Sequence, residues 1–222
     1  MLSQRSGVNA VTGEGLAEAL RGAAVVVDVT NSPSFEEKAV MEFFQSSGRN
    51  LAAAERVSGV VHHVALSVVG TPRLQSPYFR AKRVQEQLIR DSGIPFTIVQ
   101  ATQFFEFIGA IADSGVAGQS VHLSSGPMQP IAADDVALAI ADAAMATPVN
   151  GAIEIAGPER MPMSEAVSRY FAAIKDPREV AGAPGTPYFG LIVEEGSLVP
   201  TAGARLGAIR LDSWLAQQRK VA

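Results

Sequence analysis

Short apolar runs alternate with longer amphipathic segments along most of the chain. Runs rich in β-branched residues predict buried strands at residues 23–29, 60–70, 96–101 and 151–157. Between and after these runs, apolar residues recur at helical spacing, most clearly in the segments 35–57, 77–92, 103–114 and 133–146. Strands that are apolar throughout and separated by helices are typical of a parallel sheet covered on both faces. The pattern therefore predicts an α/β fold with a doubly wound parallel sheet.

Helix boundary signals support this division of the chain. Ser34, with Glu37 three residues later, predicts a capping box at the start of the first long helix, and Gly59 predicts its end. Ser76 and Pro77 predict the N-cap and the first residue of the next helix. Residues 176–206 are rich in Gly and Pro and give no clear pattern. No internal repeat or long linker divides the chain, so we expect one domain over residues 1–222.

Composition narrows the class of protein. The chain has 222 residues, of which 47% are hydrophobic and 18% charged, which favours a folded core over disorder. The net charge of -4 and the absence of a basic cluster argue against a nucleic-acid partner. With no cysteines, disulfides and thiolate metal sites are excluded. No apolar run is long enough for a bilayer, and the first residues lack a signal-peptide core, so we expect a cytoplasmic protein without a membrane partner.

Polar residues that follow the strands are the candidates for ligand binding. In doubly wound folds, ligands bind at the carboxyl ends of the strands. Thr30–Asn31–Ser32 follow the first strong strand, Ser67 lies late in the second, and Ala101–Thr102–Gln103 end and follow the third. His62 and His63 are adjacent in a strand and therefore point to opposite faces, so they are not expected to chelate one metal ion. The sequence predicts no metal site.

The stretch SPYFRAK places Tyr78 four residues before Lys82 on one helix face. A lysine ammonium near a phenol favours the phenolate, and we expect it to lower the tyrosine pKa from its usual value of about 10. Ser67 can hydrogen-bond a substrate carbonyl while Tyr78 transfers a proton. Hydride for the reduction must come from a cofactor. The alternative is that Tyr78 and Lys82 are neighbours on a solvated helix face.

The segment YFRAK after HHVALSVVG resembles the serine and Y-x-x-x-K centre of the short-chain dehydrogenase/reductases. The chain is more closely similar to their atypical, NmrA-like branch. The similar stretches cover most of residues 7–160 in the family's order: GEGLAEALRGAAVVVDV, GRNLAAAERVSGVVHHVALSVVG, SGIPFTIVQATQFFEF, PIAADDVALAIADAA and GAIEIAGPE.

The resemblance implies a Rossmann fold that binds NADP or NAD, with a substrate-cap region at about residues 158–210. It implies that the catalytic group is Ser67, Tyr78 and Lys82, and that Lys82 also holds the nicotinamide ribose. It further implies that the cofactor is bordered by Thr30, Asn31, Ala101, Thr102, Gln103 and Phe104. The expected activity is NAD(P)H-dependent reduction of a small carbonyl or quinone-like substrate. The alternatives are an NmrA-like NAD(P) sensor without turnover, or a cofactor-free interaction module.

The family's first strand, glycine-rich turn, helix and second strand have no counterpart in the sequence. That turn binds the pyrophosphate. On this alignment GVNAV is the third family strand and TGEGLAEAL its helix, while Gly13 and Gly15 are turn glycines. AAVVVDV then becomes an apolar sheet edge that invites a homo-oligomer. Three explanations stay open: a start codon assigned too late, a fragment completed by another chain, or a short variant. The last two leave NAD(P) binding open.

Overall fold

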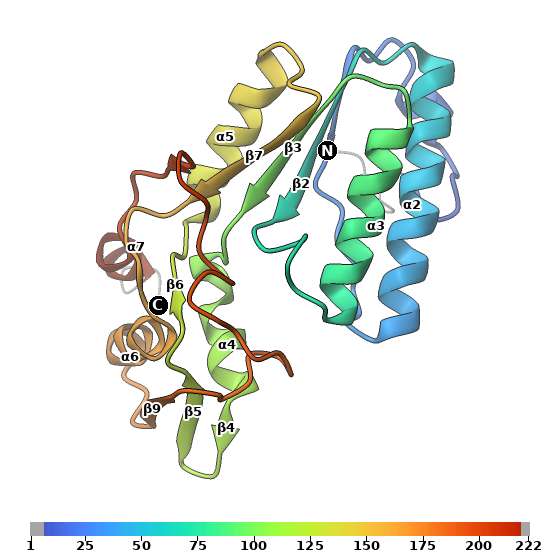
Figure 1. Cartoon of the computed structure of the whole chain (residues 1–222). Helices are drawn as coiled ribbons and strands as arrows, with labels where there is room; N and C mark the ends of the chain where they lie inside the picture. The colour runs from blue at the N-terminus through green and yellow to red at the C-terminus, as the bar shows by residue number, and fades with distance from the viewer. Residues whose placement is uncertain (1–6, 219–222) are drawn as a thin grey trace. The chain divides into compact units, whose positions relative to one another are not determined.

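The computed structural model describes residues 7–218 (Figure 1). Its largest sheet has five strands in the order β1-β2-β3-β7-β10. Their bounds are Val25–Asp28 (β1), His62–Val68 (β2), Phe96–Ala101 (β3), Gly151–Ala156 (β7) and Arg205–Leu206 (β10). β1 pairs with β2 in parallel, and β7 pairs with β10 in the same sense. A five-stranded parallel sheet with intervening helices confirms the predicted α/β fold class.

The chain divides into two compact units. Within the described range, the first comprises residues 7–67, 74–99 and 140–153, and the second comprises residues 68–73, 100–139 and 154–218. β3 and β7 each pass from one unit to the other between neighbouring residues, at Val99–Gln100 and Ile153–Glu154. One domain over the whole chain, with a cap at residues 158–210, stays a prediction.

Two helices of the first unit, α2 (Glu37–Ser58) and α3 (Pro77–Asp91), lie side by side (Figure 1). Their contact is built on Val40, Phe44 and Ala81, all fully buried, as the apolar face of the first helix predicts. Other apolar residues of α3 and the sheet form a separate cluster: Ala65, Ile89, Phe96 and Ile98. The apolar positions of the sequence thus fix how α3 packs.

Helix ends follow the predicted signals with one exception. Ser76 caps α3 by accepting the backbone N–H of Phe79 at 3.5 Å, and Gly59 ends α2 at a φ of 71°. The predicted Ser34–Glu37 capping box is wrong. The N-cap of α2 is Glu36, whose carboxylate accepts the backbone N–H groups of Lys38 and Ala39. These two hydrogen bonds lower the pKa of Glu36. The longer side chain satisfies two free amides at once, which leaves Ser34 outside the helix.

The predicted strand at GVNAV (residues 7–11) is also wrong, because this segment forms turns. The Asn9 side chain accepts the backbone N–H groups of Val11 and Thr12, which competes with strand pairing. Asn50 of α2 donates to the carbonyls of Ala10 and Val11 and holds the turn against the helix. The predicted helix in TGEGLAEAL is reduced to α1 (Leu16–Ala19).

Gly13 and Gly15 are turn residues, as predicted, with φ values of 82° and 73°. With no strand preceding it in the described part of the chain, β1 lies at one edge of the sheet. The predicted apolar edge is therefore present, and two of its valines, Val27 and Val29, are each 43% exposed.

The second unit holds most of the remaining elements. A three-stranded sheet has the order β4-β5-β9 and a pair of short strands joins β6 to β8. The strand bounds are Val116–Ala117 (β4), Ser120–Ser124 (β5), Pro127–Met128 (β6), Met161–Pro162 (β8) and Glu179–Ala183 (β9). The helices are η2 (Phe105–Phe107), α4 (Ile108–Ser114), α5 (Ala133–Met145), α6 (Met163–Ile174) and α7 (Leu211–Gln218). α5 ends in the first unit. None of the helices within residues 7–218 has the length and apolarity needed to cross a bilayer.

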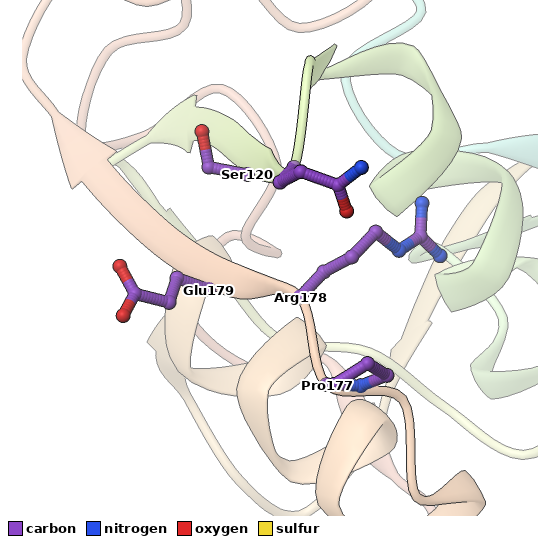
Figure 2. Close-up of a pocket in the computed structure, with 5 residues that line it drawn as sticks. Ser120, Pro177, Arg178 and Glu179 are labelled. Carbon is purple, nitrogen blue, oxygen red and sulfur yellow. The ribbon is translucent and has the colours of Figure 1, made fainter.

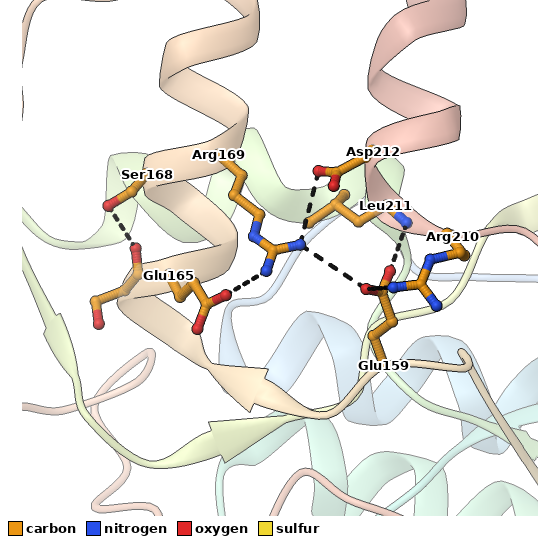
Figure 3. Close-up of polar contacts among 8 residues, drawn as sticks. Glu159, Glu165, Ser168, Arg169, Arg210, Leu211 and Asp212 are labelled. Atoms are coloured by element: carbon orange, nitrogen blue, oxygen red, sulfur yellow. Dashed lines mark hydrogen bonds and ion pairs between the residues drawn. The ribbon is translucent and has the colours of Figure 1, made fainter.

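An ion-pair network joins α6 to α7 (Figure 3). Arg169 of α6 pairs with Glu165, with Glu159 at 3.8 Å and with Asp212 of α7 at 3.6 Å. Glu159 also binds Arg210 at 2.6 Å and accepts the backbone N–H of Leu211 at 3.1 Å, so it caps the start of α7. The network positions α7 within the second unit.

The contact between α2 and α3 generates a stability prediction. Phe44 is 0% exposed, so Phe44→Ala removes a full aromatic side chain from a packed site. We expect the free energy of unfolding to fall by about 3–5 kcal/mol, measured by urea denaturation. Phe35→Ala is the matched control because Phe35 is 59% exposed, and we expect a change below about 1 kcal/mol. Equal losses in the two variants would contradict the predicted core role of Phe44.

Candidate functional site

A buried polar cluster in the first unit surrounds Lys82. The Lys82 side chain comes from α3, is 2% exposed, and donates from Nζ to the carbonyl of Leu66 at 2.8 Å and to Oε1 of Gln85. Gln85 in turn donates from Nε2 to Oδ2 of Asp28 at 2.8 Å. The Gln85 amide therefore links the ammonium to a carboxylate that lies on the edge strand.

Burial decides the ionisation of Lys82. Desolvation lowers the pKa of Lys82 to about 8, although the charges of Asp28 and Glu86 act in the opposite direction. The Nζ atom also lies 4.7 Å from the centre of the Phe44 ring, whose face attracts a cation. A charge held by a carbonyl, an amide oxygen and an aromatic ring is stabilised only in part, which is why the pKa stays below that of a solvated lysine.

Tyr78 lies one helical turn before Lys82 and has different surroundings. Its hydroxyl donates to Oδ1 of Asn31 at 3.3 Å, and its ring contacts Phe35, Phe44 and Phe79. Burial raises the pKa of Tyr78 to about 12. The expectation that Lys82 lowers this pKa is therefore wrong. The ammonium is directed to Leu66 and Gln85, and desolvation of the phenolate dominates.

Ser67 is 5% exposed, and its hydroxyl donates to Oε1 of Glu86 at 2.6 Å. Glu86 lies eight residues after Tyr78, about 12 Å further along the helix axis. Among the hydrogen bonds of residues 7–218, none joins Ser67 to Tyr78. The structure thus brings Tyr78 to Asn31 and Lys82 to Gln85, and gives Ser67 a separate partner on the same helix.

Thr30 and Asn31 form the turn that follows β1. Thr30 donates from its backbone N–H and its hydroxyl to Oδ1 of Asp28, at 2.9 and 2.7 Å. Oδ1 of Asn31 accepts the backbone N–H of Ser32 at 3.1 Å as well as the Tyr78 hydroxyl. Their predicted place at a strand's carboxyl end is confirmed, and a role toward the cofactor stays a prediction.

The other predicted cofactor residues belong to the second unit. Ala101 ends β3 and is 1% exposed. Thr102 donates from its backbone N–H to the carbonyl of Ile155 at 3.0 Å and from its hydroxyl to the carbonyl of Gln129 at 2.6 Å. Phe104 forms a bridge with Ile131. Gln103 is 6% exposed, and its Oε1 is buried without a hydrogen-bond partner. An acceptor in this condition is open to a ligand donor.

His62 and His63 take different partners, as alternation along a strand requires. His62 meets Oγ1 of Thr97 on β3 at 3.0 Å, whereas His63 meets Oε1 of Glu55 on α2 at 2.7 Å. Burial opposes a charge on His63, but the hydrogen bond and the charges of Glu55 and Asp28 outweigh it and raise the pKa. The two side chains therefore have structural partners on different elements.

The residues that sequence reasoning missed are Asp28, Gln85 and Phe44. Asp28 is the one acidic residue in the run AAVVVDV, and a charge inside an apolar strand is a signal for a buried partner. Gln85 lies three residues after Lys82, so the two share a helix face. Phe44 is recognisable only as a core position, because nothing in its spacing shows that it lies beneath the ammonium.

A pocket of 360 Å³ lies in the second unit (Figure 2). It is lined by Gln119, Ser120, Pro177, Arg178 and Glu179. Its cation is already engaged, because Arg178 pairs with Asp176 at 2.6 Å and lies 4.6 Å from the centre of the Phe171 ring. None of the predicted site residues line this pocket, so it supplies no evidence for the predicted reaction.

The described residues can be tested against the requirements of a nicotinamide dinucleotide. The unpartnered Gln103 oxygen fits the nicotinamide, whose carboxamide presents N–H donors. Residues 7–24 form turns and the four-residue helix α1, so this part of the described chain holds no strand and glycine-rich turn for a pyrophosphate. The residues present fit the nicotinamide end of the cofactor.

Comparison with known proteins places the fold. No family model matches the chain. A curated (4-alkanoyl-5-oxo-2,5-dihydrofuran-3-yl)methyl phosphate reductase from Streptomyces griseus is 35% identical over 91 residues, 40% of this chain. That match spans only 29% of the relative's own length.

Solved structures of the same fold contain dinucleotides. MoeE5 with UDP-glucose and NAD has a TM-score of 0.73 at 17% identity, over 95% of this chain and 82% of its own. A dTDP-4-dehydrorhamnose reductase from Bacillus anthracis with NADP has a TM-score of 0.72 at 11% identity, over 96% and 86% of the two chains. The chain therefore has the Rossmann-like fold of NAD-binding reductases and epimerases, while membership of the NmrA-like branch stays a prediction.

The buried ammonium predicts a pH dependence of stability. Because the folded-state pKa of Lys82 is about 8 and the usual value is 10.5, the unfolded chain binds more protons between these pH values. Stability attributable to Lys82 is therefore lowest below pH 8 and rises toward pH 10.5, by at most about 3 kcal/mol. Urea denaturation from pH 7 to 10 should show this rise in the wild type relative to Lys82→Met.

The matched control is Lys38→Met, because the Lys38 side chain is 81% exposed. We expect its stability to follow the wild type across the whole range. Parallel curves for the wild type and Lys82→Met would contradict a lowered pKa at Lys82.

Proposed function

We propose that this chain belongs to an NAD(P)H-dependent oxidoreductase that reduces a small carbonyl or quinone-like substrate. The observation that carries the proposal is a protonated phenol that lies one helical turn before a buried ammonium, next to the carboxyl ends of two parallel strands. Support also comes from the fold and from the names of two similar proteins, both reductases.

The nicotinamide cofactor supplies the hydride when it is bound. On the first unit, Lys82 has one N–H left after its two described hydrogen bonds, and this donor would be offered to a ribose hydroxyl.

Tyr78 is the proton donor in this proposal. A pKa of about 12 keeps its hydroxyl protonated at neutral pH, and Asn31 orients it through the 3.3 Å hydrogen bond. Ser67 orients the substrate only when its hydroxyl exchanges the hydrogen bond to Glu86 for one to the substrate carbonyl.

A second candidate is a protein that binds NAD(P) as a sensor, or interacts through the β1 edge, without turnover. The observation that favours it is the burial of Lys82, which is 2% exposed. The sensor predicts dinucleotide binding without hydride transfer. The interaction module predicts no dinucleotide binding and self-association through Val25–Asp28, which size measurements over a concentration series would detect.

The decisive experiment combines binding and turnover. Calorimetric titration with NADP⁺, NADPH, NAD⁺ and NADH comes first, followed by NADPH and NADH consumption against a panel of ketones, aldehydes and quinones. We expect binding and measurable reduction, and we expect Tyr78→Phe to lower kcat/KM by at least about 100-fold because the proton donor is lost.

Tyr170→Phe on α6 is the matched control, since it removes a hydroxyl from a helix of the other unit. It should retain the wild-type rate. Unchanged activity in Tyr78→Phe would overturn the assigned role, binding without turnover would support the sensor, and no binding of any dinucleotide would reject both.

A further inference from the structure

We propose that Asp28 and Gln85 are positioning residues that fix the Lys82 ammonium at the Leu66 carbonyl and keep it charged. This inference deepens the proposed function and rests on it for its catalytic meaning, but the arrangement itself can be tested without a cofactor.

The first step is the direction of each hydrogen bond. Gln85 accepts from Lys82 through Oε1 and donates to Asp28 through Nε2, so both ends of one amide are used. This fixes the amide orientation, because the ammonium can only donate and the carboxylate can only accept. The three side chains lie on one path from α3 to β1.

The second step is that Asp28 is itself held in place. It is 4% exposed, and its Oδ1 accepts the backbone N–H and the hydroxyl of Thr30, at 2.9 and 2.7 Å. Oδ2 is then left for Gln85 at 2.8 Å. Three donors therefore fix the position of the Asp28 carboxylate inside the unit.

The third step concerns the charged and polar groups that each neighbouring element places around Lys82. β1 contributes Asp28, α3 contributes Glu86, α2 contributes the Phe44 ring and β2 contributes the Leu66 carbonyl. Glu86 is already bound to Ser67 and lies 3.6 Å from Arg90, so part of its charge is offset by other partners. Asp28, reached through Gln85, is the carboxylate connected to the ammonium by described hydrogen bonds.

The fourth step distinguishes a positioning role of Gln85 from a purely structural role. If Gln85 only filled space, an apolar residue of similar volume would leave the ionisation of Lys82 unchanged. If Gln85 transmits the orientation and field of Asp28, its loss must lower the pKa of Lys82 further, because burial then meets less compensation.

The experiment is an NMR titration of the full chain labelled with ¹³Cε-lysine. The sequence contains four lysines, and the Lys82 signal is assigned by its loss in Lys82→Met. We expect the wild-type Lys82 signal to titrate near pH 8. We expect Asp28→Asn and Gln85→Met each to lower that midpoint by about one unit.

Gln87→Met is the matched control, because Gln87 lies on the same helix and its amide donates to Asp91 at an exposed position. Its Lys82 midpoint should equal that of the wild type. If Asp28→Asn fails to fold, judged by circular dichroism, Gln85→Met decides the question alone, and Gln85→Leu replaces it if that variant also fails.

A Lys82 midpoint that stays within about 0.2 units of the wild type in folded Gln85→Met and Asp28→Asn would overturn the proposal. The titration involves no dinucleotide, so its result can be interpreted even if the proposed activity is not found. Shifted midpoints together with no NADPH consumption would support the positioning role and reject the reductase.

Discussion

The burial of one positive charge constrains the first unit more than any other interaction described here. Lys82 is 2% exposed, and its ammonium must find acceptors without water. It donates to a backbone carbonyl of β2 and to a side-chain amide of its own helix, and it lies over an aromatic ring of α2. These three requirements bring the strand and both helices to one point. Removing any of them leaves a charge that the remaining partners stabilise less well.

The same arrangement explains why Tyr78 behaves differently from a tyrosine exposed beside a lysine. The phenol shares the Phe44 ring with Lys82 but directs its hydroxyl to Asn31. Separate partners keep the two groups from forming the direct ion pair that would favour a phenolate at neutral pH. The phenol therefore stays protonated at neutral pH. The pKa of the lysine, by contrast, is lowered to about 8, which is close to neutral pH.

Much of the fold could be predicted from the sequence because the apolar patterns were strong. β3 at Phe96–Ala101 matches its predicted range. The strand predicted at residues 7–11 is absent because the side-chain hydrogen bonds of Asn9 and Asn50 override a weak strand pattern. Short strands such as β9 (Glu179–Ala183) escaped notice in a Gly- and Pro-rich region.

The candidate site was less predictable. Spacing alone places Tyr78 and Lys82 on one helix face, but it does not show that the lysine points inward to Leu66. Nor does it reveal that Ser67 is engaged by Glu86, because that contact joins a strand to a helix residue nineteen positions later. Partner choice inside a polar cluster depends on tertiary packing, and sequence patterns of a single chain do not encode it.

The edge position of β1 has a consequence for solubility. A strand of four residues directs the backbone groups of alternate residues outward, so it offers an arriving extended segment only about two sites for hydrogen bonding. So short a template discourages open-ended stacking of strands, even though Val27 and Val29 are exposed there. The short length of β1 therefore limits association of the protein through this exposed edge of the sheet.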